Sequence, residues 1–318
     1  MLNILLSIIY WRSRIKLKEN PLAILYYHHV FETKNQYHPN DIIAVEFDKK
    51  IKFLSKYFTI LSLPDAMELL KTKRLPPKAL VITFDDGYQD NFTIAAPILK
   101  NHACPATFFI STSGVEKGYL WNDEVEQLIK NTAKKVISKD IIGEEITINN
   151  NDEKKQAFEL LLSKLKFLSN NKRTLQLKKL ADELGNIKFK RTMMTEQQIN
   201  TLHNDGFTIG AHTHSHTIVS TETNENCRAE LSTNKQKLES LIKSPVDYLA
   251  FPNGLYGRDF QKSHCDTAKE LGFKAAFSTN DGGAISTNTI WQIPRFMPYR
   301  KQHSLFSLSI AKIAGEHV

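Results

Sequence analysis

The sequence has few cysteines, and they are neither paired nor clustered. Cys104, Cys227 and Cys265 are the three cysteines among 318 residues, and they form no C-x-x-C motif. This pattern gives no indication of a zinc ribbon or of a disulfide framework. An arginine-rich stretch and a nucleic-acid-binding motif are also lacking, so a nucleic-acid partner is not expected.

Long hydrophobic runs are missing as well. The N-terminal run MLNILLSIIYW is too short to cross a membrane as a helix. The basic segment RSRIKLK follows this run instead of preceding it, and no small-residue cleavage site is seen, so no cleavable signal peptide is expected. Residues 1–20 are therefore expected either to pack on the protein itself or to lie as a helix on an anionic membrane surface.

The overall composition is typical of a soluble globular protein with a large core. Hydrophobic residues make up 41% of the chain and charged residues 24%. The formal net charge is +8. This excess favours anionic surroundings such as lipid headgroups or phosphate-bearing substrates.

Short apolar runs that end in polar or reactive side chains recur along the chain. Separated by helical segments, such runs are typical of parallel strands buried on both faces. Reactive residues at the carboxyl ends of several strands favour a β/α barrel. An open doubly wound sheet is the competing architecture, but the glycine-rich loop that often accompanies it is absent. The runs occupy residues 22–30, 79–87, 105–113, 207–216, 247–254, 274–283 and 290–296.

Residues 131–192 have a different pattern, with two amphipathic helices that are lysine-rich on their outer faces. We expect one catalytic domain over residues 21–318, with this segment as a helical insertion. A lid, a dimer contact, a membrane contact and a simply solvated pair of helices all remain open for it.

The strongest local signal is TFDDGYQDN at residues 83–91. Two adjacent carboxylates, Asp85 and Asp86, end a buried strand, and Gly87 permits an unusual turn. Side chains alternate along a strand, so both carboxylates can face one pocket only if the chain bends there. A helix N-cap is the alternative, but it requires only one of the two.

Three histidines follow in GAHTHSHT at residues 210–217. His212 and His216 share a face in a helical turn or an extended strand, whereas His214 joins them only in an extended segment. Two imidazoles and one carboxylate can hold a divalent metal and leave positions open for water and substrate. The spacing therefore predicts a catalytic metal site.

Together these motifs resemble the polysaccharide deacetylase family, also called the NodB-homology or carbohydrate esterase 4 group. TFDDGY and HTHSH are accompanied by YYHHV, APILKNHACPATFF, YLAFPNG and IPRF, in the family order over about residues 22–300. The resemblance implies an α/β fold, a distorted (β/α) barrel. It also implies hydrolysis of N-acetyl groups of amino sugars in a bacterial polysaccharide or lipid-linked glycan, and sometimes of O-acetyl esters.

The resemblance also assigns roles to the main residues. It makes Asp86, His212 and His216 the ligands of a divalent metal, usually zinc, although cobalt, nickel or manganese would accept the same set. Asp85 becomes the general base for a metal-activated water. The backbone N–H of Asn253 then helps to stabilise the oxyanion.

Further residues are candidates for supporting and binding roles. Thr213 is expected to brace the histidine loop, and Pro252 lies in the segment expected to contact the substrate. The family often has an arginine that orients the base where this chain has Ala250, so Arg295 is a candidate for that charge, with a purely structural ion pair as the alternative. Aromatic stacking on sugars is considered for Tyr88, Trp121 and Phe251, with core packing as the alternative.

The family's late L-x-H motif, which offers a general acid, is missing, because His303 does not match it. His28 in YYHHV is the better candidate for the acid. The alternatives left open are an O-acetyl esterase, a glycosidase that uses Asp85 and Asp86, and a catalytically decayed glycan-binding protein. We expect a bacterial cytoplasmic protein, peripheral on the inner membrane in one interpretation, and leave the oligomeric state open.

Overall fold

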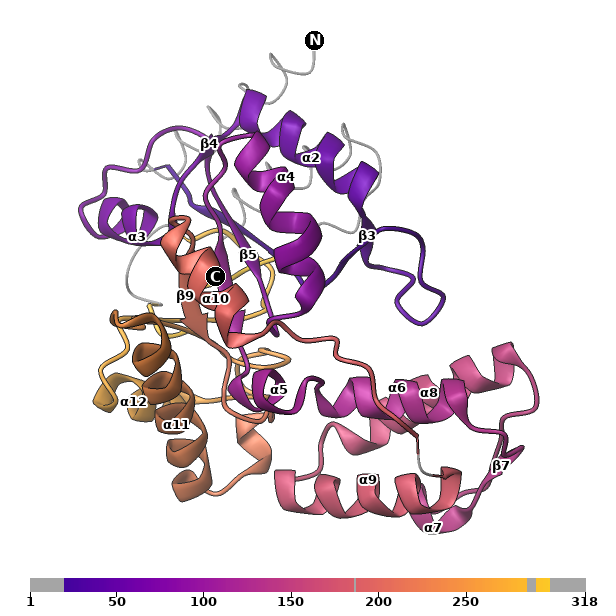
Figure 1. Cartoon of the computed structure of the whole chain (residues 1–318). Coiled ribbons are helices and arrows are strands. Elements are labelled where there is room, and N and C mark those ends of the chain that lie inside the picture. The colour runs from indigo at the N-terminus through magenta and orange to yellow at the C-terminus, as the bar shows by residue number, and fades with distance from the viewer. Residues whose placement is uncertain (1–19, 186, 285–289, 298–318) are drawn as a thin grey trace.

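The computed structural model describes residues 20–185, 187–284 and 290–297. Its core is a curled sheet of seven parallel strands (Figure 1), in the order β1-β5-β6-β9-β10-β11, with β4 beside the start of β5. Expectations for residues 1–19 and for His303 lie outside the described residues. The strands are β1 Ala23–Tyr27, β4 Thr59–Ile60, β5 Ala79–Phe84, β6 Thr107–Ile110, β9 Thr208–Ala211, β10 Tyr248–Ala250 and β11 Ala275–Phe277.

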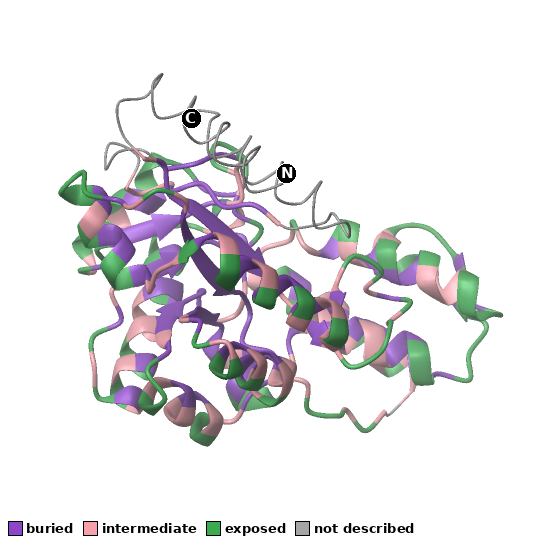
Figure 2. Cartoon of the chain, turned by 90° about the horizontal axis from the view of Figure 1, so that it is seen from above, coloured by how far each residue is buried: buried purple, intermediate pink, exposed green. Residues whose placement is uncertain are grey.

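Helices cover this sheet, and their apolar stripes explain why the strands are buried. Helix α2, for example, directs Phe47, Ile51 and Leu54 into the core. Figure 2 shows buried residues in the strands and exposed residues on the outer helix faces. The remaining elements of this part are β2 Val30–Phe31, β3 Ile42–Ile43, α2 Ala44–Tyr57, α3 Leu63–Lys71, the π-helical turn η1 Asn91–Ala95, α4 Ala96–Asn101, α5 Thr112–Lys117, α10 Glu196–Asn204, η2 Val219–Thr221, α11 Asn224–Ile242 and α12 Lys262–Glu270.

A segment near the end of the described chain links the two edges of the curled sheet. Ile293 bridges Phe277 in β11, and Phe296 bridges Leu25 in β1, both in parallel orientation. The sheet is therefore a half-barrel. The two edge strands that the structure describes do not pair with each other, and residues 293–296 bridge the gap between them. The predicted α/β fold, a distorted barrel, is confirmed, and the open doubly wound sheet is not adopted.

A second apolar core lies beside the half-barrel and is built by helices α6, α8 and α9 (Figure 1). Val125 and Leu128 of α6, Leu161 of α8 and Leu180 of α9 are fully buried in this core. Helix α6 thus packs with the two predicted helices, although it precedes the expected start of the insertion. The proposed boundaries at 131 and 192 stay a prediction. The elements are α6 Trp121–Asn131, β7 Val136–Ile137, α7 Lys139–Ile142, β8 Ile146–Thr147, α8 Asn151–Leu165 and α9 Asn170–Leu184.

Among the described helices, none combines the length and the apolar character that crossing a bilayer requires.

Candidate active site

Strand β5 ends in two carboxylates, and a bend turns both into the same cavity. The N–H of Asp85 still donates to the Tyr27 carbonyl of β1, at 2.8 Å. Asp86 then has φ of 77° and Gly87 has φ of 94°, both in the left-handed region. For a residue with a side chain this conformation costs on the order of 1–3 kcal/mol, and such strain clusters at functional sites. Both carboxylates line a cavity of about 500 Å³, so the expected bend is present.

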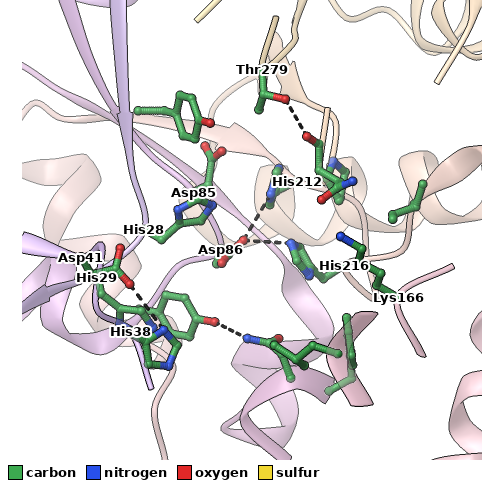
Figure 3. Close-up of a pocket in the computed structure, with 18 of the residues that line it drawn as sticks. His28, His29, His38, Asp41, Asp85, Asp86, Lys166, His212, His216 and Thr279 are labelled. Atoms are coloured by element: carbon green, nitrogen blue, oxygen red, sulfur yellow. Dashed lines mark hydrogen bonds and ion pairs between the residues drawn. The ribbon is translucent and has the colours of Figure 1, made fainter. Parts of the chain in front are cut away.

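Asp86, His212 and His216 bring three ligand atoms together, all within 4.8 Å of one another. The Nε2 atoms of His212 and His216 lie 3.2 and 3.0 Å from Oδ1 of Asp86 (Figure 3). Asp86 follows β5 and His212 follows β9, and β6 lies between these two parallel strands, so their carboxyl ends bring the residues to the same end of the sheet. Residues that lie more than a hundred positions apart in the sequence therefore form one cluster.

The hydrogen bonds around this cluster indicate what it is arranged to hold. Nδ1 of His212 lies 2.7 Å from the carbonyl oxygen of Ala250, which can only accept, so Nδ1 carries the hydrogen and, in the neutral ring, Nε2 has a free lone pair. That lone pair faces Oδ1 of Asp86, which has no hydrogen-bond partner among the described residues. Two electron-rich atoms in contact in a buried site are stable when a cation lies between them. The residues present fit a divalent metal ion.

Asp85 has a different partner, the guanidinium group of Arg295. Nη1 and Nη2 of Arg295 donate to the two carboxylate oxygens of Asp85 at 2.7 and 2.8 Å. Thr83 and Ser278 accept further hydrogen bonds from the same guanidinium. Arg295 lies in the segment that joins the sheet edges, which explains how a residue 210 positions away reaches Asp85.

The charges around the two carboxylates keep both of them ionised. Burial by itself raises the pKa of Asp85, but the positive charge of Arg295 and its hydrogen bonds to the carboxylate outweigh it and hold that pKa below its usual value. Burial also raises the pKa of Asp86, but His216 and His212 in their protonated forms outweigh it and hold that pKa well below the usual range; a cation bound between neutral imidazoles and the carboxylate would take over this role. Asp85 is therefore an ionised acceptor that lies beside the metal-ligand cluster and outside it.

The histidine loop is held in shape by its own hydroxyl groups. Thr213 has φ of 61° and accepts a hydrogen bond from the N–H of Thr217 at 3.3 Å, the contact expected for a residue that braces the loop. Nδ1 of His214 instead lies 2.8 Å from the hydroxyl of Thr112, so this ring turns away from Asp86. The middle histidine is consequently separate from the ligand cluster.

His28 lines the cavity beside both carboxylates (Figure 3). Its ring meets that of Tyr26 edge-on, with 5.7 Å between the ring centres. The side-chain amide of Asn91 donates to the backbone carbonyl of His28 at 2.7 Å. The end of TFDDGYQDN thus fixes the position of the histidine in YYHHV.

A network behind His28 is a part of the site that the sequence did not reveal. Nδ1 of His29 contacts Asp90 at 2.5 Å, and the ring of His29 stacks on Tyr88 with 3.6 Å between ring centres. His38 pairs with Asp41 and with Glu126. The H-x-x-D spacing of residues 38–41 and the adjacent histidines in YYHHV were the available signals. Among these residues His29, His38, Asp41 and Tyr88 line the cavity.

The aromatic and loop residues expected at the substrate divide into two groups. Tyr88, Trp121, Pro252 and Asn253 line the cavity. Phe251 differs from the expectation, because its fully buried ring stacks on Phe260 in the core, with 4.2 Å between ring centres. Ala250 and Phe251 are thus both buried in the core, and the chain reaches the cavity only at Pro252 and Asn253.

Comparisons with known proteins all find similarity to polysaccharide deacetylases. The polysaccharide deacetylase family model matches residues 72–154 and 167–276, more than half of the chain. YxkH of Bacillus subtilis (strain 168) is 30% identical over 114 residues, 35% of this chain and 39% of that protein. The poly-beta-1,6-N-acetyl-D-glucosamine N-deacetylase of Staphylococcus aureus (strain MSSA476) is 28% identical over 116 residues, 32% of this chain and 40% of that enzyme.

The solved structure of IcaB from Ammonifex degensii has the same fold. It superposes with a TM-score of 0.61 and 16% identity, covering 93% of this chain and 98% of IcaB. The sequence matches are shorter than this structural match. The chain spans about two fifths of the length of the curated relatives it matches.

Proposed function

Because the chain belongs to the polysaccharide deacetylase family, we propose that it is a metal-dependent deacetylase that hydrolyses N-acetyl groups of amino sugars. The substrate class is a bacterial polysaccharide or lipid-linked glycan. One observation carries the proposal. The buried cluster of Asp86, His212 and His216 shares a cavity with Asp85, which Arg295 holds separately. Such a division gives one carboxylate to the metal and leaves the other free for proton transfer.

Asp86, His212 and His216 would hold the ion, and zinc is the proposed metal. A divalent ion supplies Lewis-acid chemistry at this position, polarising an acetyl carbonyl and lowering the pKa of water from about 15.7 towards 7. The Ala250 carbonyl keeps the Nε2 lone pair of His212 directed at the site. Two imidazoles and one carboxylate leave coordination positions for water and substrate.

Asp85 is the proposed general base. Its carboxylate is ionised, because the charge of Arg295 holds its pKa below the usual value despite burial. The bidentate pair with Arg295 fixes the plane of the carboxylate, so Asp85 meets a water in one orientation. Positioned proton transfer of this kind contributes on the order of 10²–10⁴ in rate.

His28 and Asn253 complete the proposed set. His28 faces the cavity beside Asp85 and Asp86, where its imidazole can protonate the departing amine of the sugar. Asn253 lines the same cavity, and its side-chain amide donates to Asp259 at 2.9 Å. Its backbone N–H is proposed to stabilise the developing oxyanion. Proton removal and proton donation are thereby assigned to two different residues.

The proposal is tested by measuring bound metal and acetate release together. The substrates are N-acetylated glucosamine oligomers freed of O-acetyl esters, so that acetate can come only from the amide. We expect Asp85→Asn to bind metal like the wild type and to lose at least about 10²-fold in kcat, whereas His216→Ala loses the metal itself. Loss of metal in Asp85→Asn would overturn the division of roles. Release of acetate from esterified oligomers alone would make the protein an O-acetyl esterase.

We further propose that the protein works at an anionic bacterial membrane surface, from its cytoplasmic side. The net charge of +8 and the basic segment RSRIKLK after the apolar N-terminal run support this. Co-sedimentation with vesicles that contain anionic lipid should decrease when residues 1–18 are deleted. Unchanged partition of the shortened chain would contradict the proposal.

A further inference from the structure

Helix α8 presents two different faces, and one of them lines the catalytic cavity. Ala157, Phe158, Leu161 and Leu165 form the apolar stripe that is buried against α6 and α9. The adjoining stripe lies at positions i, i+3, i+4 and i+7, which share one side of a helix. Its members Glu159, Leu162, Ser163 and Lys166 all line the cavity that contains Asp85 and Asp86. The inserted helices thus form one wall of the active site.

This wall is fixed to the metal-ligand loop by buried contacts. The backbone N–H of Asn170, the first residue of α9, donates to Glu222 at 2.6 Å, and Glu222 also accepts from the hydroxyl of Thr217. Arg173 is almost fully buried, and its guanidinium lies 4.8 Å from the ring centre of Trp121. It also donates a long hydrogen bond to the carbonyl of Ser215, which precedes His216. Contacts of this kind hold α8 at a set place relative to the ligands.

Lys166 is the C-cap residue directly after α8, and it is the charged side chain of this wall that lacks an ionic partner among the described residues. Its ammonium group points into the cavity on the side of His216 (Figure 3). The other charged groups of the cavity have partners, since Asp85 pairs with Arg295, Asp41 with His38, and Glu159 approaches Lys155. Lys166 contacts the ring of Phe167 but makes no ion pair with any residue that the structure describes.

An unpaired lysine in a cavity wall is expected to attract anionic oxygen atoms. A cavity screens charge less than open solvent does, so the field of the ammonium acts over the distance to a bound sugar. Hydrogen bonds to charged groups are also stronger than those between neutral groups. A neutral acetylated glycan offers no such group, whereas a glycan with a carboxylate or a phosphate does.

We propose that α8 provides a subsite for an anionic substituent of the glycan, with Lys166 as its cation. This inference rests on the proposed deacetylase function and specifies its substrate class as a negatively charged N-acetylated glycan. In this proposal the anionic substituent of the glycan binds on the His216 side of the cavity, opposite His28. Lys166 is thus a specificity-determining residue that binds substrate and takes no part in proton transfer.

The test compares three probes of equal length. One is a neutral N-acetylglucosamine oligomer, the second alternates N-acetylglucosamine with glucuronate, and the third is the neutral oligomer ending in a 1-phosphate. The enzyme variants are Lys166→Gln, which removes the charge, and Lys166→Arg, which keeps it. Lys164→Gln is the matched control, because Lys164 lies on α8, is half-exposed and does not line the cavity. Steady-state acetate release gives KM and kcat.

We expect the wild type to prefer one anionic probe, which identifies carboxylate or phosphate as the group bound. For that probe Lys166→Gln should raise KM about tenfold with kcat nearly unchanged, and Lys166→Arg should restore most of the affinity. For the neutral probe the change should stay within about twofold. An equal effect on charged and neutral probes, or a wild type without preference, would overturn the subsite.

Equilibrium binding separates this inference from the proposed function. The same probes are titrated onto metal-loaded Asp85→Asn, with and without Lys166→Gln, so that affinity is measured without turnover. If the wild type releases acetate from all three probes alike and Lys166→Gln binds them alike, the deacetylase stands and the subsite fails. If no probe yields acetate, the deacetylase proposal fails, and the binding comparison still decides whether Lys166 recognises an anion.

Discussion

Arg295 and Asp85 form a bidentate ion pair in which both side chains are almost completely buried, with N–O distances of 2.7 and 2.8 Å. Replacing Arg295 with Met would leave a buried carboxylate without its partner. We expect a loss of about 3–5 kcal/mol in the free energy of unfolding, measured by urea denaturation, together with a fall in kcat.

The control for this prediction is Arg228→Met. Arg228 pairs with Glu270 at 2.7 Å, but both side chains are more than half exposed. Its removal should cost less than about 1 kcal/mol. Equal losses for Arg228→Met and Arg295→Met would show that burial of the ion pair between Arg295 and Asp85 does not increase its effect on the free energy of unfolding.

His28→Gln tests the proposed proton donor. An amine needs a proton to leave, whereas nitrophenolate leaves without one. The variant should therefore lose on the order of 10²-fold or more in kcat on an N-acetylated oligomer and change little on 4-nitrophenyl acetate. A similar loss on both substrates would indicate that His28 positions other groups and does not donate the proton.

His214→Gln tests the separation of the middle histidine from the metal ligands. Nδ1 of His214 lies 2.8 Å from the Thr112 hydroxyl, and its ring takes no part in the ligand cluster. We expect full metal content by elemental analysis and a loss of about 1 kcal/mol in stability, the typical net value of one hydrogen bond. His212→Gln serves as the contrast and should lose the metal.

His38 predicts a pH dependence of stability. Burial by itself lowers the pKa of His38, but hydrogen bonds with Asp41 and Glu126 outweigh it and raise that pKa to about 9. An unfolded histidine has a pKa of about 6.5, so the stabilisation is complete below that pH and is lost as pH rises through about 9. His38 should make the free energy of unfolding decrease by at most about 3 kcal/mol over this window, and His38→Gln should make the measured decrease smaller by that contribution. A remainder is expected from His29, whose pKa is raised by Asp90 against the opposite effect of burial.

The control for His38 is His102→Gln. His102 pairs with Asp48 at 2.8 Å, but the Asp48 side chain is half-exposed. This variant should keep the wild-type decrease between pH 6.5 and 9. A wild-type profile that is flat over that range would refute the assignment to His38.

The sequence predicted the half-barrel and the main cluster because the relevant signals are local. The run ALVITF with the following Asp85 and Asp86 shows both a buried strand and a bend, and the spacing of His212 and His216 shows a shared face. In the structure, the strand order β5-β6-β9 then places the ends of the two motifs at the same edge of the sheet.

The parts that the sequence did not reveal depend on tertiary contacts. The pair of His29 and Asp90 spans 61 positions and forms only when β1 and β5 align in register. Phe251 packs on Phe260 in the core, a contact between the β10 end and a later loop that the family resemblance alone did not specify. The placement of Lys166 in the cavity follows from how the inserted helices attach to the histidine loop, and periodicity shows only that such helices exist.

The segment around residues 293–296 joins the sheet edges and also carries the arginine that holds Asp85. During synthesis the ribosome releases this segment after all seven strands of the sheet have emerged. Asp85, the proposed base, thus acquires its partner only after both edges of the half-barrel have formed. Completion of the fold and maturation of the catalytic centre are consequently a single event, and chains interrupted before residue 290 are expected to be inactive even if they bind metal.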